Sequence, residues 1–143
     1  MVELPAQPQP IPRGRGERVL FVDDEEPLVI MGKGALERLG YRTTALASPI
    51  EALTVFSASP MEFDLVITDL NMPGLSGTEL ARKLVAIRPD IQLVLTTGYS
   101  SGITEAVINE LGFRELLPKP FDLRTLGETT HRALNKTTLT RRS

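Results

Sequence analysis

The chain has 143 residues, of which 41% are hydrophobic, and a formal net charge of −2, so the sequence predicts one globular domain. The charge provides no basic patch for nucleic acid, and the absence of cysteine excludes disulfide bonds, thiolate chemistry and cysteine-based zinc sites. No apolar run approaches the roughly 20 residues of a membrane span, and no signal peptide is recognisable, so we expect a cytoplasmic domain without direct contact to membrane or nucleic acid.

Proline and glycine punctuate the first part of the chain. The stretch LPAQPQPIPRGRGE, residues 4–17, has prolines and glycines so closely spaced that neither a helix nor a paired strand fits it. We therefore expect a linker over residues 1–17, a folded domain over 18–135 and a polar tail over 136–143.

From residue 18 onward, short β-rich runs alternate with segments of helical period. The predicted strands are 18–22, 41–46, 63–69, 91–97 and 115–118. The predicted helices are 27–39, 49–59, 77–87, 101–111 and 123–135. Because the middle strands are apolar on both faces, the sequence predicts an α/β, doubly wound, flavodoxin-like fold with a five-stranded parallel sheet in the order 2-1-3-4-5.

Polar residues stand where four of the predicted strands end. In a parallel sheet all carboxyl ends of the strands lie at one edge, so these residues are expected to meet there. They are Asp23, Asp24, Asp69, Thr97 and Lys119. Close carboxylates repel each other by about 4 kcal/mol per pair at roughly 4 Å and an effective dielectric constant of about 20, unless a cation lies between them. Oxygen ligands of this kind suit Mg²⁺ better than zinc.

The same edge has the parts that phosphoryl transfer requires. A fixed lysine can balance the charge of the phosphoryl oxygens, and a hydroxyl can donate a hydrogen bond to them. An aspartate can also act as the nucleophile and carry the phosphoryl group covalently.

Four motifs at these strand ends resemble those of response-regulator receiver domains. They are FVDDEEP, VITDLNMPGLSG, LVLTTGYS and LLPKPF, and the resemblance covers Arg18 to about Leu134. It implies a phosphoacceptor domain of a two-component signalling system, whose partner is a histidine kinase or a phosphotransfer protein that carries phosphohistidine. Such a domain promotes its own phosphorylation and dephosphorylation. The chain has no glycine-rich nucleotide-binding segment, so it is not a kinase by itself.

The resemblance also implies roles for the acidic residues. Asp69 would accept the phosphoryl group. Asp24 and Asp69 would bind Mg²⁺, together with the backbone carbonyl of Asn71, and Asp23 would act through a coordinated water.

For the phosphoryl group itself, the resemblance implies a hydrogen bond from Thr97 and an ion pair with Lys119. Thr96 competes with Thr97 for this role, and the small residue Gly98 decides in favour of Thr97, because the family keeps a small residue there to admit the phosphoryl group. The Lys119–Pro120 peptide bond is expected to be cis.

Three other polar residues have simpler interpretations. Glu25 and Glu26 precede a helix, where acidic residues commonly serve as caps and helix-dipole partners. His131, the single histidine, lies among polar residues of the last predicted helix and is expected to be exposed.

Three alternative functions fit these residues less well. A haloacid-dehalogenase-type phosphatase also uses an Asp nucleophile, Mg²⁺, a hydroxyl and a lysine, but it needs an acidic pair after the fourth strand, where this chain has TTGYS. A flavodoxin-like flavin binder needs a phosphate loop after the first strand, where four acids would repel the phosphate. A degenerate receiver that serves as a scaffold is disfavoured by the complete set of pocket residues.

The chain departs from the family pattern at Leu116, where many receivers have Tyr or Phe as a rotating switch. We therefore expect phosphorylation to alter the loops at 97–102 and around Lys119 while changing the last helix less than in receivers that drive transcription factors. The linker and the opening GERVLFVDDEEPLV look like the C-terminal receiver of a hybrid sensor histidine kinase. A free-standing single-domain regulator is the alternative.

Overall fold

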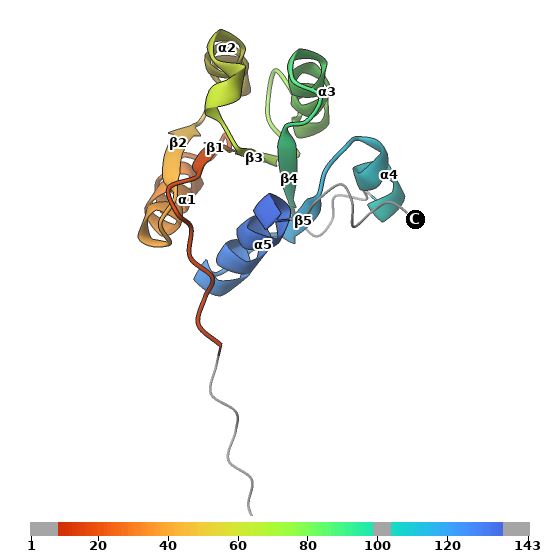
Figure 1. Cartoon of the computed structure of the whole chain (residues 1–143). Helices are drawn as coiled ribbons and strands as arrows, with labels where there is room; N and C mark the ends of the chain where they lie inside the picture. The colour runs from red at the N-terminus through yellow and green to blue at the C-terminus, as the bar shows by residue number, and fades with distance from the viewer. Residues whose placement is uncertain (1–8, 99–103, 136–143) are drawn as a thin grey trace, which may run out of the picture.

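The computed structural model of the chain describes residues 9–98 and 104–135, and Figure 1 shows a sheet with helices on both sides. Five parallel strands form the sheet in the order β2-β1-β3-β4-β5, as predicted. The strands are β1 Arg18–Val22, β2 Arg42–Leu46, β3 Leu65–Asp69, β4 Gln92–Thr97 and β5 Glu115–Pro118. Three strands were predicted to begin too early, because Tyr41, Phe63 and Ile91 are buried apolar residues that precede the first paired residue of β2, β3 and β4.

The helices alternate with the strands along the chain. They are α1 Glu26–Arg38, α2 Pro49–Ala58, α3 Gly77–Ile87, α4 Glu105–Glu110 and α5 Leu123–Asn135, with a short 3-10 helix η1 at Pro60–Glu62. The prediction missed η1, because a single turn is too short to show a period. The predicted helix 101–111 is shorter in the structure, and its residues 101–103 lie outside the described residues. Within the part of the chain that the structure describes, no helix is long and apolar enough to cross a membrane.

Alternating strand residues build one hydrophobic core on each face of the sheet. On one face, Leu20 and Val22 of β1 pack with residues of α2, α3 and α4. On the other face, Val19 and Phe21 pack with residues of α1 and α5. Both faces are therefore covered, as the apolar character of the middle strands predicted.

Side-chain caps fix where α2 and α3 begin. Ser48 accepts a hydrogen bond from the backbone of Glu51 at the start of α2. At the start of α3, Ser76 and Glu79 form a reciprocal capping box. The backbone N–H of Ser76 donates to the Glu79 carboxylate and holds the pKa of Glu79 below its usual value. These caps set the direction in which α2 and α3 leave the sheet.

The segment before β1 has no regular structure, but it lies on the domain. Residues 9–17 form neither helix nor strand, as their prolines and glycines predicted. They run along α5 and the end of α1 to reach β1 (Figure 1).

Candidate functional site

The fold brings the predicted polar residues to the carboxyl edge of the sheet. Asp23 directly follows β1. Asp69 and Thr97 are the last residues of β3 and β4, and Lys119 directly follows β5. The positions of these residues thus follow from the parallel topology.

Three carboxylates gather at this edge. Asp23, Asp24 and Asp69 each offer an oxygen, and these oxygens lie within 4.8 Å of one another. Asp23 and Asp69 are buried, with 1% and 5% of their surface exposed, whereas Asp24 is exposed. The backbone N–H of Glu25 donates to Asp23 Oδ1 over 2.9 Å and fixes that carboxylate in place.

Lys119 bridges two of the three acids. Its Nζ lies 2.9 Å from Asp23 Oδ2 and 3.0 Å from Asp69 Oδ1. Burial opposes the charge on Lys119, but the hydrogen bonds to Asp23 and Asp69 outweigh it and raise the pKa of Lys119 above its usual value. The ammonium group therefore stays charged and offsets part of the repulsion between the two carboxylates.

The surroundings of Asp69 disfavour the charged form of its carboxylate. Burial raises the pKa of Asp69 above its usual value, and the charge of Asp23 adds to this, although the hydrogen bond from Lys119 acts in the opposite direction. A buried carboxylate that is held charged among other acids gains from any further cation at this edge.

Gly77 has a positioning role that the sequence interpretation missed. A Cβ on Gly77 would lie only 2.1 Å from the backbone carbonyl oxygen of Asp69, so no larger residue fits there. The N–H of Gly77 donates to the carbonyl of Leu70 over 2.8 Å and closes the loop that follows β3. Within that loop, Met72 and Leu75 are buried in the core. The only signal in the sequence was a glycine directly after the Ser76 cap.

The remaining predicted residues lie near this cluster. Thr97 is 3% exposed, and its backbone carbonyl accepts a hydrogen bond from the N–H of Lys119 over 2.7 Å. Thr96 pairs with Asp69 in the sheet and is also buried. Asn71 is exposed in the loop after β3. The loop residues 99–102, which were expected to respond to phosphorylation, lie outside the described residues.

Two expectations about neighbouring residues have clear outcomes. The Lys119–Pro120 peptide bond is cis, as expected. Glu25 occupies the N-cap position of α1, but its side chain makes no capping hydrogen bond, so the capping interpretation of Glu25 was wrong. Glu26 lies in the first turn, where its charge favours the helix dipole. His131 is exposed, as predicted.

The acid cluster fits a divalent cation of the Mg²⁺ type. All of its ligand atoms are carboxylate oxygens, and Mg²⁺ prefers oxygen ligands at about 2.1 Å, which puts ligands on opposite sides of the ion about 4.2 Å apart. The observed spacing of up to 4.8 Å is close to that value. The open side of the exposed Asp24 leaves room for the waters that Mg²⁺ keeps.

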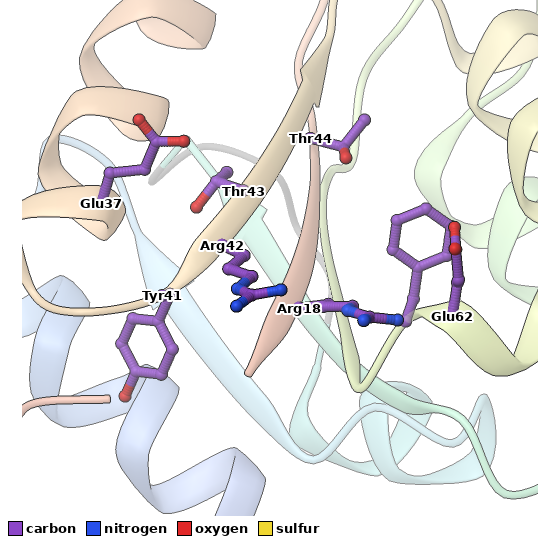
Figure 2. Close-up of a pocket in the computed structure, with 8 residues that line it drawn as sticks. Arg18, Glu37, Tyr41, Arg42, Thr43, Thr44 and Glu62 are labelled. Carbon is purple, nitrogen blue, oxygen red and sulfur yellow. The ribbon is translucent and has the colours of Figure 1, made fainter. Parts of the chain in front are cut away.

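A separate cavity at the amino end of the sheet is not this site. It has a volume of about 580 Å³ and is lined by residues of β1, β2 and η1 together with their neighbours (Figure 2). Arg18 and Arg42, which begin β1 and β2, lie beside it. None of the three clustered aspartates contributes to its lining. This cavity is therefore separate from the acid cluster at the carboxyl edge.

Comparison with known proteins identifies relatives of the whole domain. The sequence profile described as response regulator receiver domain matches residues 19–131. The sensor kinase CckA of Brucella abortus (strain 2308) is 34% identical over 118 residues, which are 82% of this chain and 12% of that protein. The response regulator receiver protein CpdR of the same strain is 31% identical over 110 residues, which are 77% of this chain and 90% of that protein. The chain thus spans a small part of the first relative and nearly all of the second.

A solved structure agrees with the family profile. The crystal structure of a response regulator receiver domain protein from Clostridium thermocellum has a TM-score of 0.80 and 29% sequence identity. The match covers 87% of this chain and 98% of that chain.

Proposed function

The chain belongs to the response regulator receiver domains of two-component systems, and from this premise we propose that Asp69 accepts a phosphoryl group from a phosphohistidine in a reaction that requires Mg²⁺. The observation that carries the assignment to Asp69 is its geometry. Asp69 is the member of the acid cluster that is the last residue of a central strand. Its carboxylate pairs with Lys119, and an oxygen of it also lies next to those of the two other acids.

The reaction follows from nucleophilic attack by this carboxylate. An oxygen of Asp69 attacks the phosphorus, and the bond between phosphorus and the histidine nitrogen breaks. The electron pair of that bond stays on the imidazole nitrogen, which takes up a proton, and an acyl phosphate remains on Asp69.

The neighbouring residues balance charge during this step. Asp23, Asp24 and the carbonyl of Asn71 would hold Mg²⁺ together with Asp69, and the ion would neutralise the phosphoryl oxygens. Lys119, which is 3.0 Å from Asp69 in the absence of a phosphoryl group, would pair with a phosphoryl oxygen. The Thr97 hydroxyl would donate a hydrogen bond to another.

The donor would approach from the side of α1. An apolar cavity of about 430 Å³ lies directly beside Lys119. Its lining joins α1 to the segment after β5 and consists of Leu28, Met31, Gly98, Lys119, Pro120 and Phe121. Ile30, which lines a second cavity together with Met31, is 68% exposed although it is apolar. A helical phosphotransfer partner with an apolar face could cover this surface while its histidine reaches Asp69.

Two settings for such a domain differ in what surrounds it. The similarity to the sensor kinase CckA supports a receiver within a hybrid sensor kinase in the cytoplasm, which we propose as the setting. The similarity to CpdR, of which the chain covers 90%, supports a free-standing regulator as the alternative. Phosphotransfer assays distinguish the two settings. A receiver of a hybrid kinase should be phosphorylated by a kinase core encoded in the same reading frame, and a free-standing regulator by a separate protein.

The proposal is tested by phosphorylation with acetyl phosphate, followed by intact-mass spectrometry with and without Mg²⁺. The wild-type chain should gain one phosphoryl group only in Mg²⁺, and Asp69→Asn should remain folded and unlabelled. Equal labelling of Asp69→Asn would contradict the assignment. Steady turnover of phosphomonoesters at enzyme-like rates would instead favour the haloacid-dehalogenase-type phosphatase.

A further inference from the structure

The segment before β1 is bound to the domain by backbone hydrogen bonds at the end of α1. The N–H of Gly14 donates to the carbonyl of Leu39 over 2.6 Å, and the N–H of Gly16 donates to the carbonyl of Gly40 over 2.8 Å. These acceptors lie just beyond the last residue of α1, where helix carbonyls need partners. The segment therefore satisfies the carbonyl of Leu39, the C-cap residue of α1, and that of the residue after it.

Arginine side chains tie the same segment to both helices. Arg13 donates to the carbonyl of Arg38, the last residue of α1, over 2.9 Å. From the other side, Arg124 of α5 donates to the carbonyl of Gln9. The segment is thus held between two helices that are far apart in the sequence.

Three glycines allow the close contact between this segment and the domain: Gly14 belongs to the segment, whereas Gly40 and Gly127 belong to the surface beneath it. A Cβ on Gly14 would lie 2.4 Å from the Tyr41 ring, and a Cβ on Gly40 would lie 2.6 Å from the Gly14 carbonyl oxygen. On α5, a Cβ on Gly127 would lie 2.5 Å from Ile11. Glycine inside a helix costs roughly 0.5–1 kcal/mol relative to alanine. Among the described residues, Ile11 comes nearest to a Cβ at position 127, and Leu39 follows at 3.1 Å. The surface is therefore shaped for its occupant.

The contact of Ile11 belongs to a larger hydrophobic cluster. Ile11 packs against the buried residues shared by α1 and α5, which include Leu39, Tyr41 and Leu126. Arg124 and Gly127 are both in the N-terminal half of α5. Loss of the segment would therefore uncover apolar surface of both helices and remove two contacts of α5.

We propose that the cleft between the C-terminal end of α1 and the first half of α5 is an interaction surface for an extended, glycine-containing segment. Residues 9–16 are its occupant, and their docking fixes the position of α5. The backbone hydrogen bonds that hold the segment lie just before β2, at the end of the strand opposite to the carboxyl edge.

The test compares amide hydrogen exchange in the full chain and in Gly14→Val. The backbone of Gly14 is outside the left-handed region, so valine strains no turn there, and its Cβ would conflict with the Tyr41 ring. Arg15→Val is the matched control, because it places the same side chain at an exposed position between the two backbone hydrogen bonds of the segment. If Gly14→Val does not fold, Ile11→Ser replaces it.

The proposal expects protected amides at positions 14 and 16 in the wild-type chain and in Arg15→Val. In Gly14→Val their exchange should accelerate at least about tenfold, and exchange across α5 should accelerate with it. Unprotected amides at these positions in the wild-type chain would overturn the proposal. So would an α5 that exchanges equally in both variants.

Rescue in trans tests the surface itself. The peptide QPIPRGRGE, residues 9–17, is added to Gly14→Val at about millimolar concentration, the range that replaces a short tether. It should restore the protection of α5, whereas the same peptide with valine in place of the residue at 14 should not. Failure of the unmodified peptide to restore protection, or equal rescue by both peptides, would refute a specific surface.

Discussion

The carboxyl edge of the sheet and the cleft that holds residues 9–16 both depend on glycines that let two chain segments meet, but they differ in charge. At the carboxyl edge, Gly77 admits the Asp69 carbonyl next to three acids that repel one another. In the cleft, glycines admit apolar and backbone groups that complement each other. The carboxylates of the first region therefore repel one another until a cation lies between them, whereas the contacts of the second region are already matched to the segment that they hold.

The largest effect is expected for Gly77→Ala. The new Cβ would meet a backbone oxygen rather than a flexible side chain, so the loop after β3 must shift and carry Asp69 with it. We expect phosphorylation by acetyl phosphate to be lost and the free energy of unfolding to fall by about 1–3 kcal/mol. Urea unfolding and intact-mass spectrometry measure the two effects.

Gly34→Ala is the matched control for this change. Gly34 lies inside α1, and a Cβ there would meet nothing within 4 Å. The same substitution should therefore raise the free energy of unfolding, by about 0.5–1 kcal/mol, and leave phosphorylation by acetyl phosphate unchanged. If both variants behaved alike, the close approach of Gly77 to Asp69 would have no functional meaning.

The next effect separates activity from stability at the acid cluster. Asp24→Asn removes a ligand of the cation, so Mg²⁺-dependent phosphorylation should disappear. It also removes one of three clustered charges, so the free energy of unfolding of the metal-free domain should stay the same or rise by up to about 1 kcal/mol. Phosphorylation kinetics in Mg²⁺ and urea unfolding in a chelator measure the two. A rate in Mg²⁺ equal to that of the wild-type chain would remove Asp24 from the site.

A smaller effect is expected where a signal from the carboxyl edge reaches α5. Leu116 of β5 is half-buried against the core and has no ring to fill space after a shift of Thr97. A beryllofluoride phosphoryl mimic should change amide exchange near Thr97 and Lys119 more than across residues 115–126. Leu116→Phe should enlarge the change across 115–126. Large changes there in the wild-type chain, together with dimerisation, would show that leucine does not weaken the switch.

The smallest effect concerns the cleft at alkaline pH. Burial, with the Glu17 carboxylate as a second cause, raises the pKa of Tyr41 to about 12. Because an unfolded tyrosine titrates at about 10, the stabilisation by the neutral phenol is complete below pH 10 and is lost as the pH rises from about 10 to about 12. Tyr41→Phe should lack this loss, which urea midpoints at several alkaline pH values would show. Equal slopes in both proteins would contradict the burial of this phenol against residues 9–16.

The sequence predicted most of the fold and of the carboxyl edge, because both depend on periodic or local signals. Alternating strand residues and the order of strands placed Asp23, Asp69 and Lys119 together without any knowledge of side-chain contacts. Residues 9–17 show the limit of such reasoning. Their prolines and glycines correctly predicted the absence of helix and strand, but the same composition fits a free linker and a docked segment equally well.

Whether residues 9–17 are a free linker or a docked segment depends on contacts between residues that are distant in the sequence. Ile11 packs against Gly127, and Gly14 packs against Tyr41. No local sequence pattern predicts either contact. The same holds for Gly77 at the carboxyl edge, whose role is visible only when the Asp69 carbonyl is placed beside it. Glycines with tertiary roles are therefore the residues that sequence patterns explain least.

The most direct test of the account locates the phosphoryl group chemically. The chain is incubated with acetyl phosphate and Mg²⁺, the acyl phosphate is reduced with borohydride to homoserine, and peptide mass spectrometry finds the modified position. The account predicts homoserine at position 69 and none when a chelator removes Mg²⁺. Homoserine at position 23 or 24 with Asp69 unchanged, or modification of Asp69 that is indifferent to Mg²⁺, would contradict it.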